Sequence, residues 1–169
     1  MTGQGRVYFL PVGGTALSVL SPYPPERVEP ILVEEMVSEG LTRYEPDPRY
    51  WHSADGLPYG YDIQPAEAET DPEELQLVER AAGTTMRCDI GLHIFVSDLA
   101  GRPALARMAQ QVTQRTDGWV FVEFHDPPTA TLLRRLDDAG RCIRVGDAVY
   151  LDAAAMAAWI ARPDFHVVK

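Results

Sequence analysis

Two histidines and two acidic residues in the second half of the chain have the types of side chain that a metal-dependent hydrolase uses. His125 and Asp126 are adjacent, and Glu123 stands just before them. His93 belongs to an apolar, strand-like run that a sheet could bring alongside. Imidazole nitrogens and carboxylate oxygens are common zinc ligands. These residues could instead have purely structural roles. His93 alternates with apolar residues in a strand expected to be buried, and Asp126 stands where a helix cap is expected. A metal-dependent hydrolase using these four residues is therefore the alternative hypothesis.

Other catalytic chemistry has less support in the sequence. There is no Gly-x-Ser-x-Gly turn and no glycine-rich loop followed by Lys-Ser/Thr. Cys88 and Cys142 lack the spacing of metal ligands, and we expect both to be small buried side chains. The sequence does not decide whether they form a disulfide with each other. Glu123 and Asp98 could form an acid–base pair, although carboxylates at strand ends often cap helices. We expect a protein without catalytic residues, metal or cofactor.

The residues best suited to binding lie in one Pro/Gly-rich segment, residues 44–74, where aromatic side chains alternate with acidic ones. Large aromatics dominate the energetics of protein interfaces, and surrounding carboxylates accelerate the approach of a basic partner. Alternatively, the aromatics pin the segment to the domain and the acids are merely solvated. The predicted partner-binding residues are Tyr50, Trp51, Asp55, Tyr59, Tyr61, Asp62, Glu67 and Glu69.

The charge distribution favours a binding role. The chain of 169 residues has a net charge of −10. Residues 1–80 hold 15 carboxylates against 5 arginines, whereas residues 81–169 hold 10 acids and 10 bases. A one-sided acidic field repels nucleic acid and anionic membranes and attracts cationic proteins. We therefore expect a basic protein partner, no nucleic acid and no membrane. The absence of a secretory pattern at the start predicts a cytoplasmic location.

Apolar periodicity and the placement of glycine and proline predict intermixed helices and strands. The expected strands span residues 6–12, 15–20, 86–96, 119–124, 142–145, 148–151 and 165–168, with a further short one over 59–63. The expected helices end near Glu39, follow the cap Asp71, and span 103–116, 128–139 (capped by Asp126) and 153–161 (capped by Asp152). Gly13-Gly14 and Gly146-Asp147 predict two-residue hairpin turns.

This order predicts an α+β fold, with a mixed, mostly antiparallel sheet covered by helices. Residues 86–124 form one βαβ unit of the ferredoxin-like kind. We expect a single globular domain over residues 1–169, with a long acidic Pro/Gly-rich loop at about 45–70.

Three short motifs mark the second half: the strand at residues 92–97 (LHIFVS), the turn at 116–119 (TDGW) after a helix, and the ending at 159–169 (WIARPDFHVVK). Over residues 89–169 the chain resembles small bacterial immunity proteins of polymorphic toxin systems. The resemblance implies a non-catalytic cytoplasmic protein that neutralises one toxin, often a basic nuclease, by occluding its active site. It assigns no functional residues and does not extend to residues 1–85. A regulatory or scaffold module with a small-molecule pocket is a further alternative.

Overall fold

One antiparallel sheet organises the chain. The computed structural model describes residues 14–96 and 99–168. The strands are β1 (Thr15–Ser21), β2 (Thr42–Arg43), β3 (Tyr50–His52), β4 (Pro58–Pro65), β5 (Cys88–Ile94), β6 (Trp119–Val122), β7 (Cys142–Val145) and β8 (Ala148–Leu151). The helices are α1 (Pro25–Ser38), α2 (Ala66–Glu69), α3 (Pro72–Ala82), α4 (Arg102–Arg115), α5 (Ala130–Ala139) and α6 (Ala153–Ile160). Within the described ranges, the strands pair in the order β2-β3-β4-β5-β1-β6-β8-β7, always antiparallel. The expected α+β class is confirmed.

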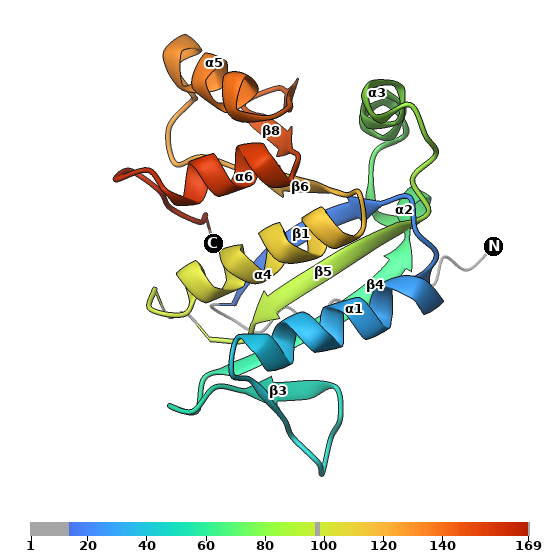
Figure 1. The fold of residues 1–169 in the computed structure, drawn as a ribbon, viewed down its shortest axis with the longest axis vertical. Coiled ribbons are helices and arrows are strands. Elements are labelled where there is room, and N and C mark those ends of the chain that lie inside the picture. The colour runs from blue at the N-terminus through green and yellow to red at the C-terminus, as the bar shows by residue number, and fades with distance from the viewer. Residues whose placement is uncertain (1–13, 97–98, 169) are drawn as a thin grey trace, which may run out of the picture.

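The centre of the sheet is ferredoxin-like. β1 lies between β5 and β6 and is antiparallel to both, so β5 and β6 are parallel to each other and are connected through α4. The βαβ unit expected from the sequence is therefore present. A second unit interleaves with it, because β5 lies between β1 and β4, which are connected through α1 and the β2-β3 pair. Helices α1, α4 and α6 cover the same face of the sheet (Figure 1).

The covered face holds the main core, and helix α1 illustrates how the sequence builds it. Pro25 stands in the first turn, where its missing N–H removes no helical hydrogen bond. Val28, Leu32 and Met36 are all buried at helical spacing. Gly40 follows the helix with a φ of 82°, a conformation that glycine adopts without strain. The helix ends where the sequence predicts.

Two of the three predicted helix caps are confirmed. The Asp71 carboxylate accepts from the Glu73 backbone N–H, and that of Asp152 accepts from the Ala155 N–H. The prediction for Asp126 is wrong, because α5 starts four residues later and its cap is Thr129, whose hydroxyl accepts from the Leu132 N–H. Two prolines follow Asp126 and keep the chain extended before the helix begins.

The short strand expected over 59–63 is present and longer, as β4, but the surrounding loop expected at 45–70 is wrong for much of its length, because the segment also contains β3 and α2. Pro58 and Pro65 stand at the two ends of β4, so neither interrupts its interior. β4 pairs with β5 over its full span from Tyr59 onward. Residues 165–168, expected as an edge strand, form none, and residues 6–12 lie outside the described ranges.

Within residues 14–96 and 99–168, the opposite face of the sheet is covered only in part, by α2 and α3. There Val78 and Ala66 pack with the strand residues Leu20, Trp119 and Tyr150 in a second, smaller core. The rest of this face, which we call the open face, carries the side chains that alternate with the core residues of β4, β5, β1 and β6. It is the part of the sheet that could serve as a site.

Candidate functional site

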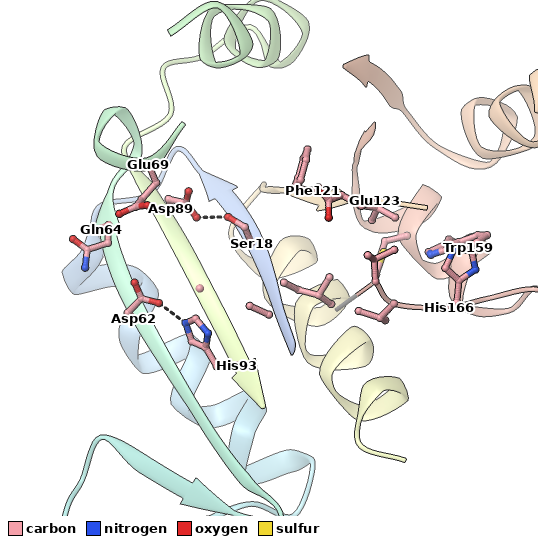
Figure 2. Close-up of a pocket in the computed structure, with 17 residues that line it drawn as sticks. Ser18, Asp62, Gln64, Glu69, Asp89, His93, Phe121, Glu123, Trp159 and His166 are labelled. Carbon is pink, nitrogen blue, oxygen red and sulfur yellow. Dashed lines mark hydrogen bonds and ion pairs between the residues drawn. The ribbon is translucent and has the colours of Figure 1, made fainter. Parts of the chain in front are cut away.

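The open face contains a cleft of about 400 Å³. Strands β4, β5, β1 and β6 form its floor, and residues 166–168 line one side (Figure 2). Its charged and titratable lining residues are Asp62, Glu69, Asp89, Glu123, His93 and His166. Among the described residues, no arginine or lysine lines the cleft. The ionisable side chains of the cleft are therefore carboxylates and histidines, while much of the remaining lining is apolar and includes Met156 and Trp159 of α6.

Asp89 is the most enclosed of these carboxylates, with a relative exposure of 8%. Its Oδ1 accepts a hydrogen bond from the Ser18 hydroxyl on the neighbouring strand (Figure 2). The Thr70 hydroxyl lies 3.5 Å from its Oδ2. Burial raises the pKa of Asp89, the Asp62 charge adds to that effect, and the two hydroxyls oppose it. A carboxyl whose pKa is perturbed inside a cleft is typical of functional sites.

Asp62 and His93 form a second pair across the middle strands. The His93 Nε2 lies 2.6 Å from the Asp62 Oδ1. Both side chains extend over Gly91: a Cβ atom there would lie 2.2 Å from that oxygen and 2.9 Å from that nitrogen. Only glycine leaves room for the pair, so the sequence at position 91 fixes the floor of the cleft.

Aromatic rings continue from the cleft toward the edge of the sheet. The His93 ring stacks on Phe95 with centroids 5.7 Å apart, and Phe95 meets Tyr50 edge-on at 5.3 Å. Phe95 lies over Gly60, where a Cβ atom would be 2.5 Å from the ring. Tyr50 is 40% exposed. We call Tyr50, Phe95, His93, Asp62 and Asp89 the open-face stripe.

The other side of the cleft is built around His166. Its Nε2 accepts from the His125 backbone N–H at 3.0 Å, and its Nδ1 lies 2.9 Å from the Asp164 carbonyl oxygen. Because Nε2 accepts, Nδ1 must be the protonated nitrogen that donates to this carbonyl. The rings of His125 and His166 stack with centroids 4.3 Å apart, and Trp159 packs edge-on against His166. These contacts hold the end of the chain beside β6.

The structure divides the eight predicted partner-binding residues. Asp62 and Glu69 line the cleft, and Tyr50 joins it through the stripe. The prediction that Trp51 and Tyr59 contact a partner is wrong, because these residues are only 3% and 2% exposed and belong to the core.

The remaining three predicted residues lie outside the cleft. Tyr61 is half-buried and donates to Glu29, and burial with this contact raises its pKa to about 12. Asp55 and Glu67 are exposed, with the Asp55 carboxylate accepting from Ser53. The prediction missed Ser18 and Asp89, although the alternation of Asp89, Gly91 and His93 between apolar residues was a readable signal.

The four metal ligands of the alternative hydrolase hypothesis are not brought together in the structure. His93 and Glu123 line the cleft, whereas His125 stacks on His166 and Asp126 is exposed before α5. Within the described ranges, no three His, Cys, Asp or Glu side chains are grouped to hold a metal ion. Asp98, the expected acid–base partner of Glu123, lies outside the described residues.

Among the described residues of the cleft, no serine or cysteine is paired with a histidine. The Ser18 hydroxyl bonds to Asp89 while His93 bonds to Asp62, and the two pairs are separate (Figure 2). Cys88 and Cys142 are both free, and burial raises the pKa of each thiol to about 11. A thiol with so high a pKa is a poor nucleophile at neutral pH.

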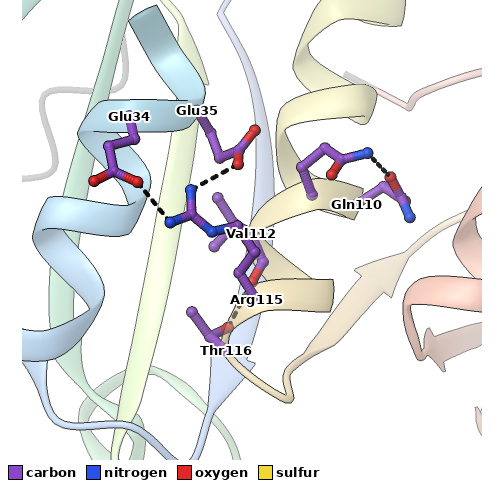
Figure 3. Close-up of polar contacts among 7 residues, drawn as sticks. Glu34, Glu35, Gln110, Val112, Arg115 and Thr116 are labelled. Carbon is purple, nitrogen blue, oxygen red and sulfur yellow. Dashed lines mark hydrogen bonds and ion pairs between the residues drawn. The ribbon is translucent and has the colours of Figure 1, made fainter. Parts of the chain in front are cut away.

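Three acidic residues near the end of α1 are paired with arginines from the second half: Arg115 bridges Glu34 at 2.5 Å and Glu35 at 2.8 Å (Figure 3), and Arg107 pairs with Glu39 at 3.1 Å. These pairs fix α1 to α4 and neutralise part of the acidic charge expected from the sequence. Only Asp62 and Glu69 of the first half line the cleft, and other acids of that half, such as Glu26 and Asp55, are exposed outside it.

Searches of family models, curated proteins and solved structures find no match to this chain. No helix in the described residues is both long and apolar enough to span a bilayer.

Proposed function

We propose that the chain is a binding protein that holds a cationic segment of a protein partner on its open face. The observation that carries this proposal is the cleft lining, which combines four carboxylates and two histidines with no arginine or lysine among the described residues. Partner specificity then comes from charge complementarity, which rejects acidic surfaces and accelerates encounter with basic ones.

The two aromatic residues at the edge of the open-face stripe, Tyr50 and Phe95, supply the apolar part of the interface. Tyr50 and Phe95 are presented by β3 and by the end of β5, so their rings are held by the sheet rather than by a mobile loop. Rigid aromatic anchors lose little conformational entropy on binding. The stripe thus places an anchor beside an acidic cleft, which suits a partner segment with a basic side chain next to an apolar one.

We further propose that the partner is a toxin and that the chain is its immunity protein. The support is the resemblance over residues 89–169 together with the acidic cleft, since a carboxylate-rich surface suits the cationic active site of an enzyme that cleaves nucleic acid. Neutralisation requires only occlusion of the active site, with no covalent chemistry.

The test is a binding titration with basic toxin-like proteins encoded beside the gene. We expect a complex tighter than about 1 μM. The triple variant Asp62→Asn, Glu69→Gln, Glu123→Gln should reduce the association rate by about tenfold or more at low salt. A matched control removes three exposed charges elsewhere, Glu26→Gln, Asp126→Asn, Asp138→Asn, and should change the rate by less than about twofold. Equal effects of the two triple variants would remove the cleft from the interface.

A second function, acid–base catalysis, is favoured by the raised pKa of Asp89 in a cleft. Both of its oxygens already have hydroxyl neighbours, which suits a structural or binding role better than proton transfer to a ligand. Asp89→Asn tests catalysis directly, because it would abolish turnover if this carboxyl transfers a proton, whereas a binding protein has no turnover to lose and shows only a change in partner affinity.

A further inference from the structure

A second groove, separate from the cleft, lies at the far end of the sheet, where β1 ends and β6 begins. Its volume is about 940 Å³, and no residue lines both sites. The walls come from the start of α1, the last turns of α4 and the start of α6. Gln110, Gln114 and Thr113 on α4 contribute amide and hydroxyl groups.

Arg27 lies on one wall of this groove. Its guanidinium carbon is 3.7 Å from the centroid of the Tyr23 ring, so the two groups are stacked. The Tyr23 hydroxyl in turn donates to Asp117 at 3.1 Å, which fixes the ring beneath the guanidinium. Arg27 donates no hydrogen bond within the described residues and has no carboxylate within ion-pair distance there. Its N–H donors are therefore held in place without a protein acceptor.

Arg141 lines the same groove and also lies over an aromatic ring. Its guanidinium carbon is 5.2 Å from the centroid of the buried Trp119 ring, and one of its Nη atoms donates to the Ala81 carbonyl oxygen. It too pairs with no carboxylate in the described ranges. Two exposed arginines thus face one groove, each stacked on an aromatic ring.

The two acidic residues that line the groove form no ion pair with these arginines among the described residues. The Asp117 carboxylate accepts from Tyr23, and that of Asp152 caps α6. Elsewhere in the chain, arginines near carboxylates do form pairs with them, as Arg107 and Arg115 do on α4. A guanidinium stacked on a ring and left with free donors is suited to bidentate binding of an oxyanion.

We propose that this groove binds a small molecule through a phosphate or carboxylate group held by Arg27 and Arg141. The net charge of −10 disfavours an anionic macromolecule, so the ligand is small. A groove of this size lies within the range for small-ligand sites. The site is independent of the proposed partner surface.

Calorimetric titration with inorganic phosphate and, separately, with citrate tests the proposal and distinguishes the two oxyanion sources. At least one anion should bind and raise the melting temperature. Arg27→Gln and Arg141→Gln should each weaken binding by about tenfold or more. Arg135→Gln, at an exposed α5 arginine outside the groove, should change it by less than about twofold.

Arg27→Lys keeps the charge but loses the planar donor fork, and should weaken binding nearly as much as Arg27→Gln. Arg27 is exposed in the first turn of α1, so its variants should fold even if removal of Arg141 disturbs Trp119. The proposal is overturned if neither anion binds, or if Arg135→Gln weakens binding as much as the two groove variants do.

Discussion

Substitution of Gly91 by alanine should disassemble the cleft while leaving the fold in place. The new Cβ atom would stand 2.2 Å from the Asp62 Oδ1 and 2.9 Å from the His93 Nε2, well inside contact distance. Both side chains must therefore rotate away, and the 2.6 Å contact between them must break. Because each is partly exposed, with 48% and 27% of its side-chain surface accessible, each has solvent to move into.

The expected cost to stability is small. Crowding of a methyl group into a packed site costs about 1–3 kcal/mol, and the flexible neighbours here place the cost at the low end. Replacing a strand glycine by alanine returns about 0.5–1 kcal/mol through the lower entropy of the unfolded chain. The exposed Asp62–His93 pair contributes less than about 1 kcal/mol. The free energy of unfolding should thus change by no more than about 1–2 kcal/mol.

Urea denaturation and histidine NMR measure the two parts of this prediction. The unfolding midpoint should shift modestly with an unchanged slope, whereas the His93 ring signals should move substantially. Asp62→Asn serves as the control, since it keeps the shape of the side chain and leaves Gly91 intact. Unchanged His93 signals in Gly91→Ala, or loss of more than about 4 kcal/mol, would refute the described packing over Gly91.

Three further predictions concern charge and burial. Because burial raises the pKa of Asp89 above its unfolded value, the folded chain holds that proton more tightly, and Asp89's contribution to stability falls as pH rises through the interval between the two values. Asp89→Asn should flatten that part of the pH profile in urea titrations and be at least as stable as the parent at pH 7, and a steeper profile would contradict the assignment. Since burial raises the thiol pKa of Cys88 and Cys142 to about 11, alkylation at pH 8 should be slow in the native protein and fast in urea, and equal rates would contradict their burial. Arg115→Gln should lower the free energy of unfolding by about 1–2 kcal/mol, and by less at high salt, because it removes an exposed pair with Glu34 and leaves the more enclosed Glu35 carboxylate without its ionic partner; a salt-independent loss would argue against an ionic origin.

Local signals in the sequence predict much of the fold. The αL glycine after α1, the Gly146-Asp147 turn between β7 and β8, and the cap at Asp152 each act within a few residues, so a single sequence reveals them. The strand order does not follow from such signals. Insertion of β1 between β5 and β6 depends on contacts between residues far apart in the chain.

Prediction of the candidate site succeeded only in part, for a related reason. Proline content in residues 45–70 indicated a loop with one short strand over 59–63, whereas the observed strand runs from Pro58 to Pro65 and turns Tyr59 inward and Asp62 outward. Composition alone cannot separate these two directions. The alternation of Asp89, Gly91 and His93 indicated that they share one face of the strand, but the contacts of Asp89 with Ser18 and Thr70 join residues far apart in the chain and follow only from the fold.

Carboxyl footprinting of the complex with the cationic partner tests the central claim most directly. Carbodiimide labelling followed by mass spectrometry reports the accessibility of each acidic side chain with and without the partner. We predict that binding protects Asp62, Glu69 and Glu123 while the exposed Asp138 on α5 keeps its reactivity. Protection of Asp138 with unchanged labelling of the three cleft carboxylates would contradict a partner surface on the open face.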